Sequence, residues 1–367
     1  MFVAWRDLRH ARGRFALIAT VVALITVLVG FLSGLTGGLA AQNVSALLQL
    51  PGDRLVLQHP SSGQASFSQS SLSPSTVQTW RDAPGVSEAL PVGIAQTRAT
   101  LDGSVADSAS ESDSAAVAAF GMAGGQGDSA LVALAPAADD EIGLSEGAAR
   151  ELGAAVGDSV AIGGRSFRVT SVGGDAWYSH TPVVVLTPSA WATVDQRMGG
   201  TGEPTVLAVS GAPDWDALAS RTGTSAQEPL LSLTALETFR SEIGSLGLMV
   251  ALLFGISALV VGAFFTVWTM QRSGDIAVLK ALGATTRSLV VDALGPALVV
   301  LVAGIGAGML VVLGLAALMD SALPFLVAPL TTAVPAVAMT LLGLAGAAVA
   351  LRTVTSADPL TALGSNR

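Results

Sequence analysis

Four long apolar stretches dominate the pattern of hydrophobic and polar positions along the chain. Each reaches about 20 residues or more, the length that a helix needs to cross a bilayer, and only a helix satisfies its own backbone in lipid. We predict membrane spans at residues 15–40, 243–270, 289–319 and 333–352, with an outer loop at 320–332. A cleaved signal peptide is the alternative for the first stretch, but its apolar part exceeds the usual length of about 7–15 residues.

Residues 41–242, between the first two spans, have the pattern of a folded domain. Alternation of apolar and polar residues predicts strands at 53–58, 159–162, 166–172 and 183–186. Helix-start residues predict short helices at 73–82 and 145–152. Apolar residues at helical spacing predict stalk helices at both ends of the domain: Val44, Leu47 and Leu48 at one end, and Leu233, Leu236 and Phe239 within 232–241 at the other. We expect an α-helical membrane protein with four transmembrane helices and an inserted α/β (α+β) extracytoplasmic domain.

Basic residues gather near three of the span ends and indicate the orientation of the chain. The N-terminal segment, the loop at 271–288 with its flanks, and the C-terminal end together hold nine Lys and Arg against four Asp, and the rest of the chain sums to −14. Short basic segments face the cytoplasm. We therefore predict a multi-pass protein of the cell membrane with both termini cytoplasmic, including the tail at 353–367. Residues 1–14 are predicted to form an amphipathic helix on the inner membrane surface.

Composition removes several classes of function. The chain has 367 residues, 51% of them hydrophobic and 12% charged, and it has no Cys, which excludes disulfides and thiolate metal sites. The net charge of −9 argues against a nucleic-acid partner. His10, His59 and His180 lack the spacing of metal ligands. The only lysine, Lys280, precedes Ala281, whereas a Walker phosphate loop needs Lys followed by Ser or Thr. We expect no catalysis, no metal site and no intrinsic cofactor.

The loop at 271–288 (QRSGDIAVLKALGATTRS) contains a short amphipathic pattern. Ile276, Leu279 and Leu282 fall on one face of a helix that Gly283 is expected to end. Such a helix can lie on the membrane surface, or it can dock into a groove on a partner protein. The pattern alone leaves both possibilities open.

Residues 272–284 resemble the signature of a known family of membrane proteins. The run RSGDIAVLKALGA is similar to the pattern R-x-x-(E/D)-I-x-x-L-K-A-L-G-A of MacB/FtsX-type ABC transporter permeases. The segment ADPLTAL at 357–363 is similar to the family's P-x-x-A-L ending, and LSEGAARELGAAVG at 144–157 resembles part of its outer core. With the four-span layout, the resemblance covers nearly the whole chain.

The resemblance implies a permease that is driven by other polypeptides. In that family two permeases pair above two ATPase subunits, which bind ATP and Mg²⁺, and the inner loop docks on them as a coupling helix. The residues of this chain that would make the coupling contact are Arg272, Asp275, Ile276, Leu279, Lys280, Leu282 and Gly283. In size and layout the chain resembles the compact four-span branch that includes the HrtB heme-efflux permeases.

The outer ends of the first two spans hold the candidate substrate cavity of such a permease. Its predicted residues are Leu28, Phe31, Leu35, Glu237, Arg240, Glu242, Leu246, Met249, Val250 and Phe254. Charges at this level are costly unless they are satisfied, which marks them as site candidates. A hydrophobic substrate taken from the bilayer suits this set, and heme is the leading expectation, with its iron near Met249 or Glu242 and its propionates near Arg240.

Two other functions fit the same architecture. A regulatory permease would move its outer domain against a cell-wall hydrolase or a sensor without transporting anything. A lipoprotein or peptide exporter would need a wide lateral opening between the first two spans. The Ser-rich, acidic segment at 102–114 is predicted to be a flexible surface loop, with a cation site as the alternative.

Overall fold

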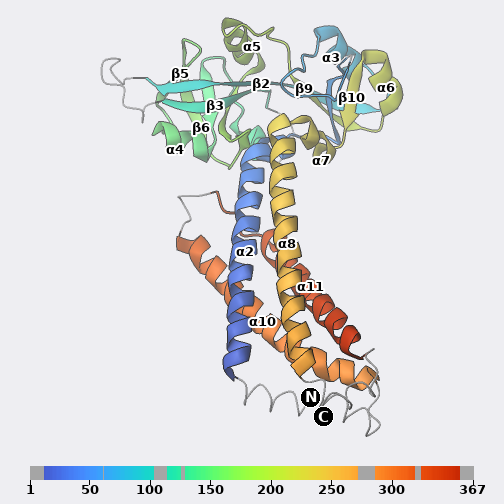
Figure 1. The fold of residues 1–367 in the computed structure, drawn as a ribbon. Helices are drawn as coiled ribbons and strands as arrows, with labels where there is room; N and C mark the ends of the chain where they lie inside the picture. Colours follow the sequence, from blue (N-terminus) through green and yellow to red (C-terminus); the bar gives the residue numbers. More distant parts are fainter. Residues whose placement is uncertain are drawn as a thin grey trace, which may run out of the picture. The chain divides into compact units, whose positions relative to one another are not determined.

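The chain folds into two compact units. The computed structural model describes residues 12–60, 62–102, 114–124, 129–271, 286–318 and 324–355. Met1–Gly38 and Gly244–Arg367 form a helical unit, and Leu39–Ile243 form the inserted domain. The first two long helices, α2 and α8, each have one end in the inserted domain and the rest in the helical unit (Figure 1).

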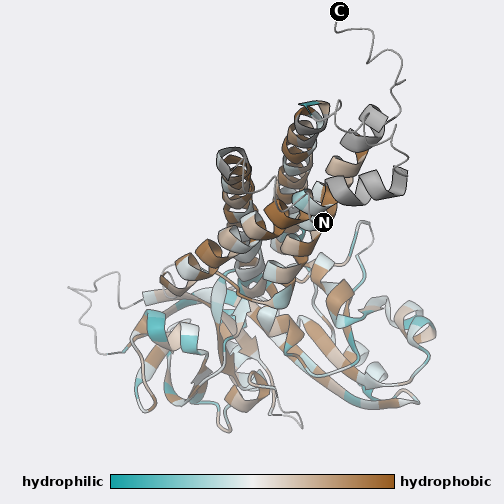
Figure 2. Ribbon diagram, turned by 90° about the horizontal axis from the view of Figure 1, so that it is seen from below, coloured by the Kyte–Doolittle hydropathy of each residue, from teal (hydrophilic) through white to brown (hydrophobic). Residues whose placement is uncertain are grey.

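Four long helices make up the helical unit. They are α2 (Arg12–Leu48), α8 (Glu237–Gln271), α10 (Thr286–Leu318) and α11 (Pro329–Thr355). Within the described ranges, these four are long and apolar enough to cross a membrane, over Phe15–Leu48, Glu237–Phe264, Leu294–Leu318 and Pro329–Val349. Figure 2 shows hydrophobic residues along them. The helices α2 and α8 extend beyond the lengths that their apolar stretches predict, because each continues into a stalk.

Glycines allow close contacts within the helical unit. A β-carbon at Gly308 of α10 would lie 2.6 Å from the Ala23 carbonyl oxygen of α2. A β-carbon at Gly38, also on α2, would lie 1.8 Å from the Pro324 carbonyl oxygen, just before α11. In lipid no hydrophobic driving force brings helices together, so their association depends on close packing. Small residues at such contacts let the backbones approach each other closely.

The inserted domain is built around one long strand, β2, which is part of two sheets. The strands are β1 (Arg54–Gln58), β2 (Val86–Leu101), β3 (Ser114–Gly121), β4 (Glu141–Leu144), β5 (Ser159–Ile162), β6 (Arg165–Val172), β7 (Trp177–Tyr178), β8 (Thr181–Leu186), β9 (Val206–Gly211) and β10 (Thr224–Gln227). The first part of β2 joins the sheet β10–β1–β9–β2. Its second part begins the order β2–β3–β8–β4–β6–β5, in which β5 returns to pair with β2 and closes a ring.

Short helices cover the two sheets. The helices α3 (Pro74–Arg81) and α6 (Trp215–Thr222) pack on the first sheet, and α4 (Glu146–Leu152) and α5 (Pro188–Arg197) pack on the second (Figure 1). The Ser73 hydroxyl accepts a hydrogen bond from Thr76 N, and the Ser145 hydroxyl accepts one from Ala148 N. Both serines therefore act as N-caps, which confirms the helices predicted at 73–82 and 145–152. The fold class predicted from the sequence, four apolar helices with an inserted domain rich in strands, is confirmed as well.

The strands that sequence alternation misses are mostly central ones. The four predicted strands correspond to β1, β5, β6 and β8, with bounds that differ by at most two residues. By contrast, β3 (SAAVAAFG) and β9 (VLAVSG) are buried along nearly their whole length and show no alternation. A strand covered on both faces reads as a continuous apolar run, so period two cannot reveal it.

Two stalk segments, residues 39–48 of α2 and 237–243 of α8, belong to the inserted domain. Val44 and Leu47 are buried in a core that also contains Leu233 and Leu236. Leu48, the last residue of α2, is 45% exposed although it follows Val44 by four positions and so lies on the same side of the helix. The segment at 232–241 is also not one helix, since Pro229–Ser232 form α7, Leu233–Ala235 form the 3₁₀ turn η3, and α8 starts at Glu237.

Several predicted elements lie outside the described residues. They are residues 1–11 of the N-terminal amphipathic helix, residues 272–285 with the coupling helix, residues 356–367 of the tail, and residues 103–113 of the Ser-rich segment.

Candidate functional site

The two stalk segments are joined directly through the side chain of Asn43. Its amide nitrogen Nδ2 donates a hydrogen bond of 2.8 Å to Glu242 Oε2, and its oxygen Oδ1 accepts one of 2.9 Å from Thr238 Oγ1. Asn43 is completely buried, and Glu242 is half-buried. A buried amide is stable only when its polar atoms are paired, so this residue holds α2 and α8 in one register.

The turn between β7 and β8 binds the same part of α2 through its backbone. The backbone nitrogens of Ser179 and His180 donate to the carbonyl oxygens of Asn43 and Gln42, at 2.9 and 3.1 Å. His180 Nε2 also lies 3.0 Å from Glu242 Oε1. Both turn residues have positive φ, 49° and 64°, a conformation that residues with a β-carbon rarely adopt. We call Asn43, Ser179, His180, Thr238 and Glu242 the stalk junction.

Tyr178, immediately before this turn, is buried under the junction. Its ring makes edge-to-face contacts with Phe67 and Phe120, with centroid distances of 6.4 and 5.8 Å. Burial raises the pKa of the Tyr178 hydroxyl well above its ordinary value, and the nearby Glu237 carboxylate raises this pKa further. The phenol is therefore neutral over the whole physiological pH range.

The three charged residues predicted for the substrate cavity all contact the inserted domain. Arg240 Nη1 donates to Gln64 Oε1 at 2.7 Å, and Glu237 Oε1 accepts from Ser66 Oγ at 3.3 Å. Glu242 belongs to the stalk junction. Partners of this kind satisfy the charges at the end of the second span.

The apolar residues predicted for the cavity lie in the helical unit and have different surroundings. The ring of Phe31 is 5.5 Å from that of Phe325, and Phe254 packs against the core of the helices. Leu28 and Met249 are each 53% exposed within this chain. The remaining three, Leu35, Leu246 and Val250, are half-buried. The charged residues of the predicted cavity thus lie in the inserted domain and its apolar residues lie in the helical unit. A cavity that contains both sets stays a prediction.

Sequence reasoning misses Asn43, Ser179, His180 and Thr238. The signal for Asn43 was available, because it is a polar residue inside the apolar stalk face, next to Val44 and three positions before Ala46. His180 stands between two strands, and only the fold brings it to Glu242. The predicted coupling residues, Arg272, Asp275, Ile276, Leu279, Lys280, Leu282 and Gly283, all lie outside the described residues. Among the residues that are described, no group of three His, Asp or Glu side chains is placed to hold a metal ion.

The fold defines a multi-span membrane protein whose large domain is inserted between the first two spans. Two family models match this chain: the MacB-like periplasmic core domain over residues 16–222, and the FtsX-like permease C-terminal region over residues 247–359. The first match alone covers more than half of the sequence. The chain belongs to the MacB/FtsX family of ABC transporter permeases, proteins of the plasma membrane that work with an ATPase.

Curated relatives match the chain from end to end. It is 24% identical to the hemin transport system permease protein HrtB of Staphylococcus haemolyticus (strain JCSC1435) over 367 residues, which cover 99% of each protein. It is 26% identical to an ABC transporter permease of Mycobacterium bovis over 379 residues, again covering 99% of each.

Two solved structures are similar to the inserted domain. The periplasmic region of MacB from Actinobacillus actinomycetemcomitans matches 52% of this chain and 94% of its own, with 12% identity and a TM-score of 0.35. The extracellular domain of the transporter YknZ from Gram-positive bacteria matches 49% and 92%, with 13% identity and a TM-score of 0.31.

Proposed function

We propose that this chain is the permease of an exporter that removes a hydrophobic molecule from the membrane, with heme as the leading substrate. The observation that carries the proposal is its similarity to hemin transport permeases over 99% of both chains. Such an alignment includes the inserted domain and all four apolar helices, so the likeness extends to the complete arrangement that a transport cycle needs.

The energy for transport would come from a separate ATPase. The only lysine of the chain is Lys280, which precedes alanine, so the sequence has no Walker phosphate loop. We propose that ATP and Mg²⁺ bind to two copies of the partner, that this chain is not itself an enzyme and carries no resident cofactor, and that residues 272–283 make the coupling contact. This arrangement requires both termini to be cytoplasmic.

We further propose that two copies of the chain pair through α8. Its apolar window is 11% buried within the chain, compared with 33% for those of α2 and α10 and 22% for that of α11. Leu248, Leu252 and Leu259 are among its exposed side chains. A helix that packs so little on its own chain is available to a second copy as well as to lipid.

Heme fits the chemistry along α8. Glu242, Leu246 and Met249 recur at helical spacing, which aligns a carboxylate, an apolar surface and a thioether on one face. Thioether sulfur is one of the groups that ligate heme iron in proteins, which supports Met249 as the contact to the iron. Arg240 would attract the propionates.

The decisive experiment measures ATP hydrolysis by the permease and its ATPase together in lipid nanodiscs, with and without hemin. We expect hemin to raise the rate for the native chain and for the control Leu341→Ala, an exposed side chain of α11, and to raise it much less for Met249→Ala. Iron-free protoporphyrin tests the contribution of the metal. If hemin leaves the rate unchanged and a deletion strain is no more sensitive to hemin than its parent, heme is not the substrate.

A regulatory permease is the second candidate, and the stalk junction favours it equally. Because one turn contacts both stalks, movement of the stalks would reach the rest of the inserted domain whether or not a substrate passes. In that case ATP hydrolysis would respond to a cell-wall hydrolase or a sensor protein and not to hemin. A lipoprotein or peptide exporter would instead respond to its polypeptide substrate.

A further inference from the structure

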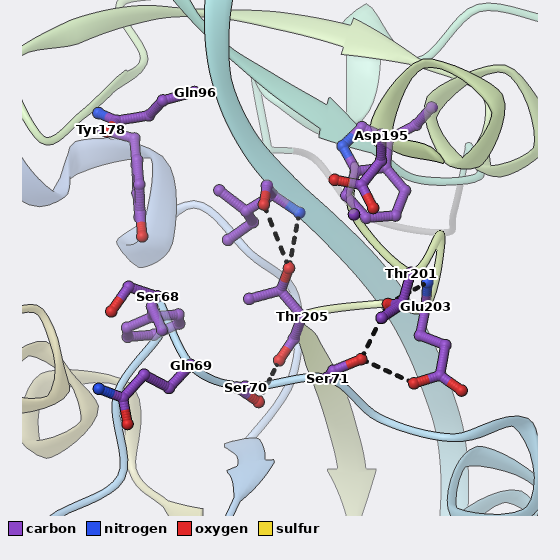
Figure 3. A pocket seen from close by; sticks show the side chains of 14 residues that line it. Ser68, Gln69, Ser70, Ser71, Gln96, Tyr178, Asp195, Thr201, Glu203 and Thr205 are labelled. Atoms are coloured by element: carbon purple, nitrogen blue, oxygen red, sulfur yellow. Dashed lines mark hydrogen bonds between the residues drawn. The ribbon is translucent and has the colours of Figure 1, made fainter. Parts of the chain in front are cut away.

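A cavity of about 380 Å³ opens in the inserted domain where β2 passes from one sheet to the other (Figure 3). Its walls are the segment at 67–71 before α3, β2 at Ile94 and Gln96, Tyr178 of β7, and α5 with the loop that follows it, including Asp195, Thr201 and Glu203. The volume lies at the small end of the range for ligand pockets, which is about 300–1,000 Å³.

Hydrogen bonds hold the floor of the cavity in place. The Thr205 hydroxyl accepts from Ile94 N at 3.0 Å, and the Thr205 carbonyl oxygen accepts from Ser70 Oγ at 2.6 Å. Ser71 Oγ donates to Glu203 Oε2 at 2.7 Å. The walls are therefore preorganised, and a ligand would not need to order them, which lowers the entropic cost of binding.

Tyr178 presents its hydroxyl to this cavity. Only 6% of the residue is exposed, and its hydroxyl points into the cavity on the side of Ser68 (Figure 3). Among the described residues, none forms a hydrogen bond with this hydroxyl. This hydroxyl is therefore free to donate to, or accept from, a molecule that binds in the cavity.

Two carboxylates line the opposite side. Asp195 Oδ2 accepts from Gly202 N at 2.8 Å, and Glu203 Oε2 accepts from Ser71, which leaves one oxygen of each carboxylate without a hydrogen-bond partner in the described part of the chain. Both side chains are half-buried. The lining includes Gln69 and Gln96 but no Lys, Arg or His, so nothing in it neutralises the two negative charges. The field in the cavity therefore favours a cation.

We propose that this cavity binds a compact organic ammonium ion that also carries hydroxyl groups, of the amino-sugar type. Its ammonium group would lie between Asp195 and Glu203, and a hydroxyl would pair with Tyr178. The ligand would touch elements of both sheets, since Glu203 precedes β9 of the first sheet and Asp195 lies on α5, which packs on the second. This site is independent of the proposed export function and is a place where the inserted domain can respond to the cell exterior.

The chain offers its own reporter, because Tyr178 is its only tyrosine. The full-length protein in detergent, grown with 3-fluorotyrosine, should give a single fluorine NMR resonance from the cavity. We expect glucosamine to shift it in a saturable manner and glucose, which has the same ring without the ammonium group, to leave it in place. Ethanolamine serves as a smaller ammonium probe.

Three variants sharpen the test. Asp195→Asn and Glu203→Gln should each weaken glucosamine binding by about tenfold or more, because each removes a charged hydrogen-bond acceptor. Glu88→Gln, an exposed carboxylate outside the cavity lining, should bind like the native chain. The resonance of each ligand-free variant shows whether its fold is intact. Equal shifts with glucose and glucosamine, no saturable shift with either amine, or equal binding by all three variants would each overturn the proposal.

Discussion

The side-chain amide of Asn43 donates a hydrogen bond of 2.8 Å to Glu242 Oε2, so the first and second stalks are linked although 199 residues separate these positions in sequence. The same Glu242 lies 3.0 Å from His180, on the turn that binds the backbone of α2. Three segments thus meet at one buried amide. Any movement of the stalks within the permease family's cycle must either carry this turn along or break these bonds.

Removing the amide should therefore destabilise the inserted domain. In Asn43→Leu, Thr238 and Glu242 each lose a partner, and we expect a loss of about 1–3 kcal/mol in the free energy of unfolding. Thermal unfolding followed by circular dichroism measures it. Gln42→Leu, one residue earlier on the same stalk, is the control and should change stability little, because the junction uses only its backbone oxygen. Equal stability of the two variants would contradict a structural role for the amide.

The turn at Ser179 stores backbone strain that glycine should relieve. Its φ is 49°, and a β-carbon in this left-handed region costs about 1–2 kcal/mol. Ser179→Gly and Ser179→Ala both lose the hydroxyl contact with Thr238, so the difference between them isolates the β-carbon. We expect the glycine variant to be more stable than the alanine variant by about 1 kcal/mol in denaturant unfolding. The opposite order would show that the turn is not held in this conformation.

Tyr178 should resist ionisation at alkaline pH. Burial, with a smaller contribution from Glu237, raises the pKa of its hydroxyl above the ordinary value. Because the pKa is raised in the folded state, the stability that this group contributes is complete below pH about 10 and is lost as the pH rises further. Phenolate absorbance reports this single tyrosine directly, and it should appear near pH 10 only in denaturant. Glu237→Gln should lower the folded pKa without restoring the ordinary value, since burial is the larger cause.

Asp139 should contribute stability that acid removes. Hydrogen bonds from Ser189 and Thr187, helped by the Arg165 charge, lower the pKa of its carboxyl. A lowered folded pKa means that the contribution is complete above pH about 4 and is lost as the pH falls through the folded value. Asp139→Asn should make the melting temperature fall less steeply in acid than it does for the native chain. Asp140→Asn, which removes neither hydrogen bond, should keep the native slope.

The coupling prediction is tested on the inner loop. Leu279→Asp places a charge on the predicted apolar face of that helix, and we expect it to abolish the stimulation of ATP hydrolysis by substrate in the complex. Ala277→Asp, on the opposite side of the same predicted helix, should have a much smaller effect. An unchanged response of Leu279→Asp would show that this loop does not contact the ATPase.

The sequence by itself determined what depends on neighbours along the chain. Apolar length predicts the four spanning helices, and Ser73 and Ser145 predict helix starts because an N-cap bonds to a backbone nitrogen only three residues away. Strands with one covered face, such as β5, show their alternation directly.

Only the tertiary structure decided what depends on distant segments. Alternation cannot reveal β3 and β9, because both of their faces are covered, nor can it show that β2 changes partners halfway. The stalk junction joins positions 43, 180 and 242, and the cavity joins Tyr178 to Asp195 and Glu203. The pairing of a buried polar group is set by whichever segments fold against it, and that choice is made by the packing of the whole domain, not by local sequence.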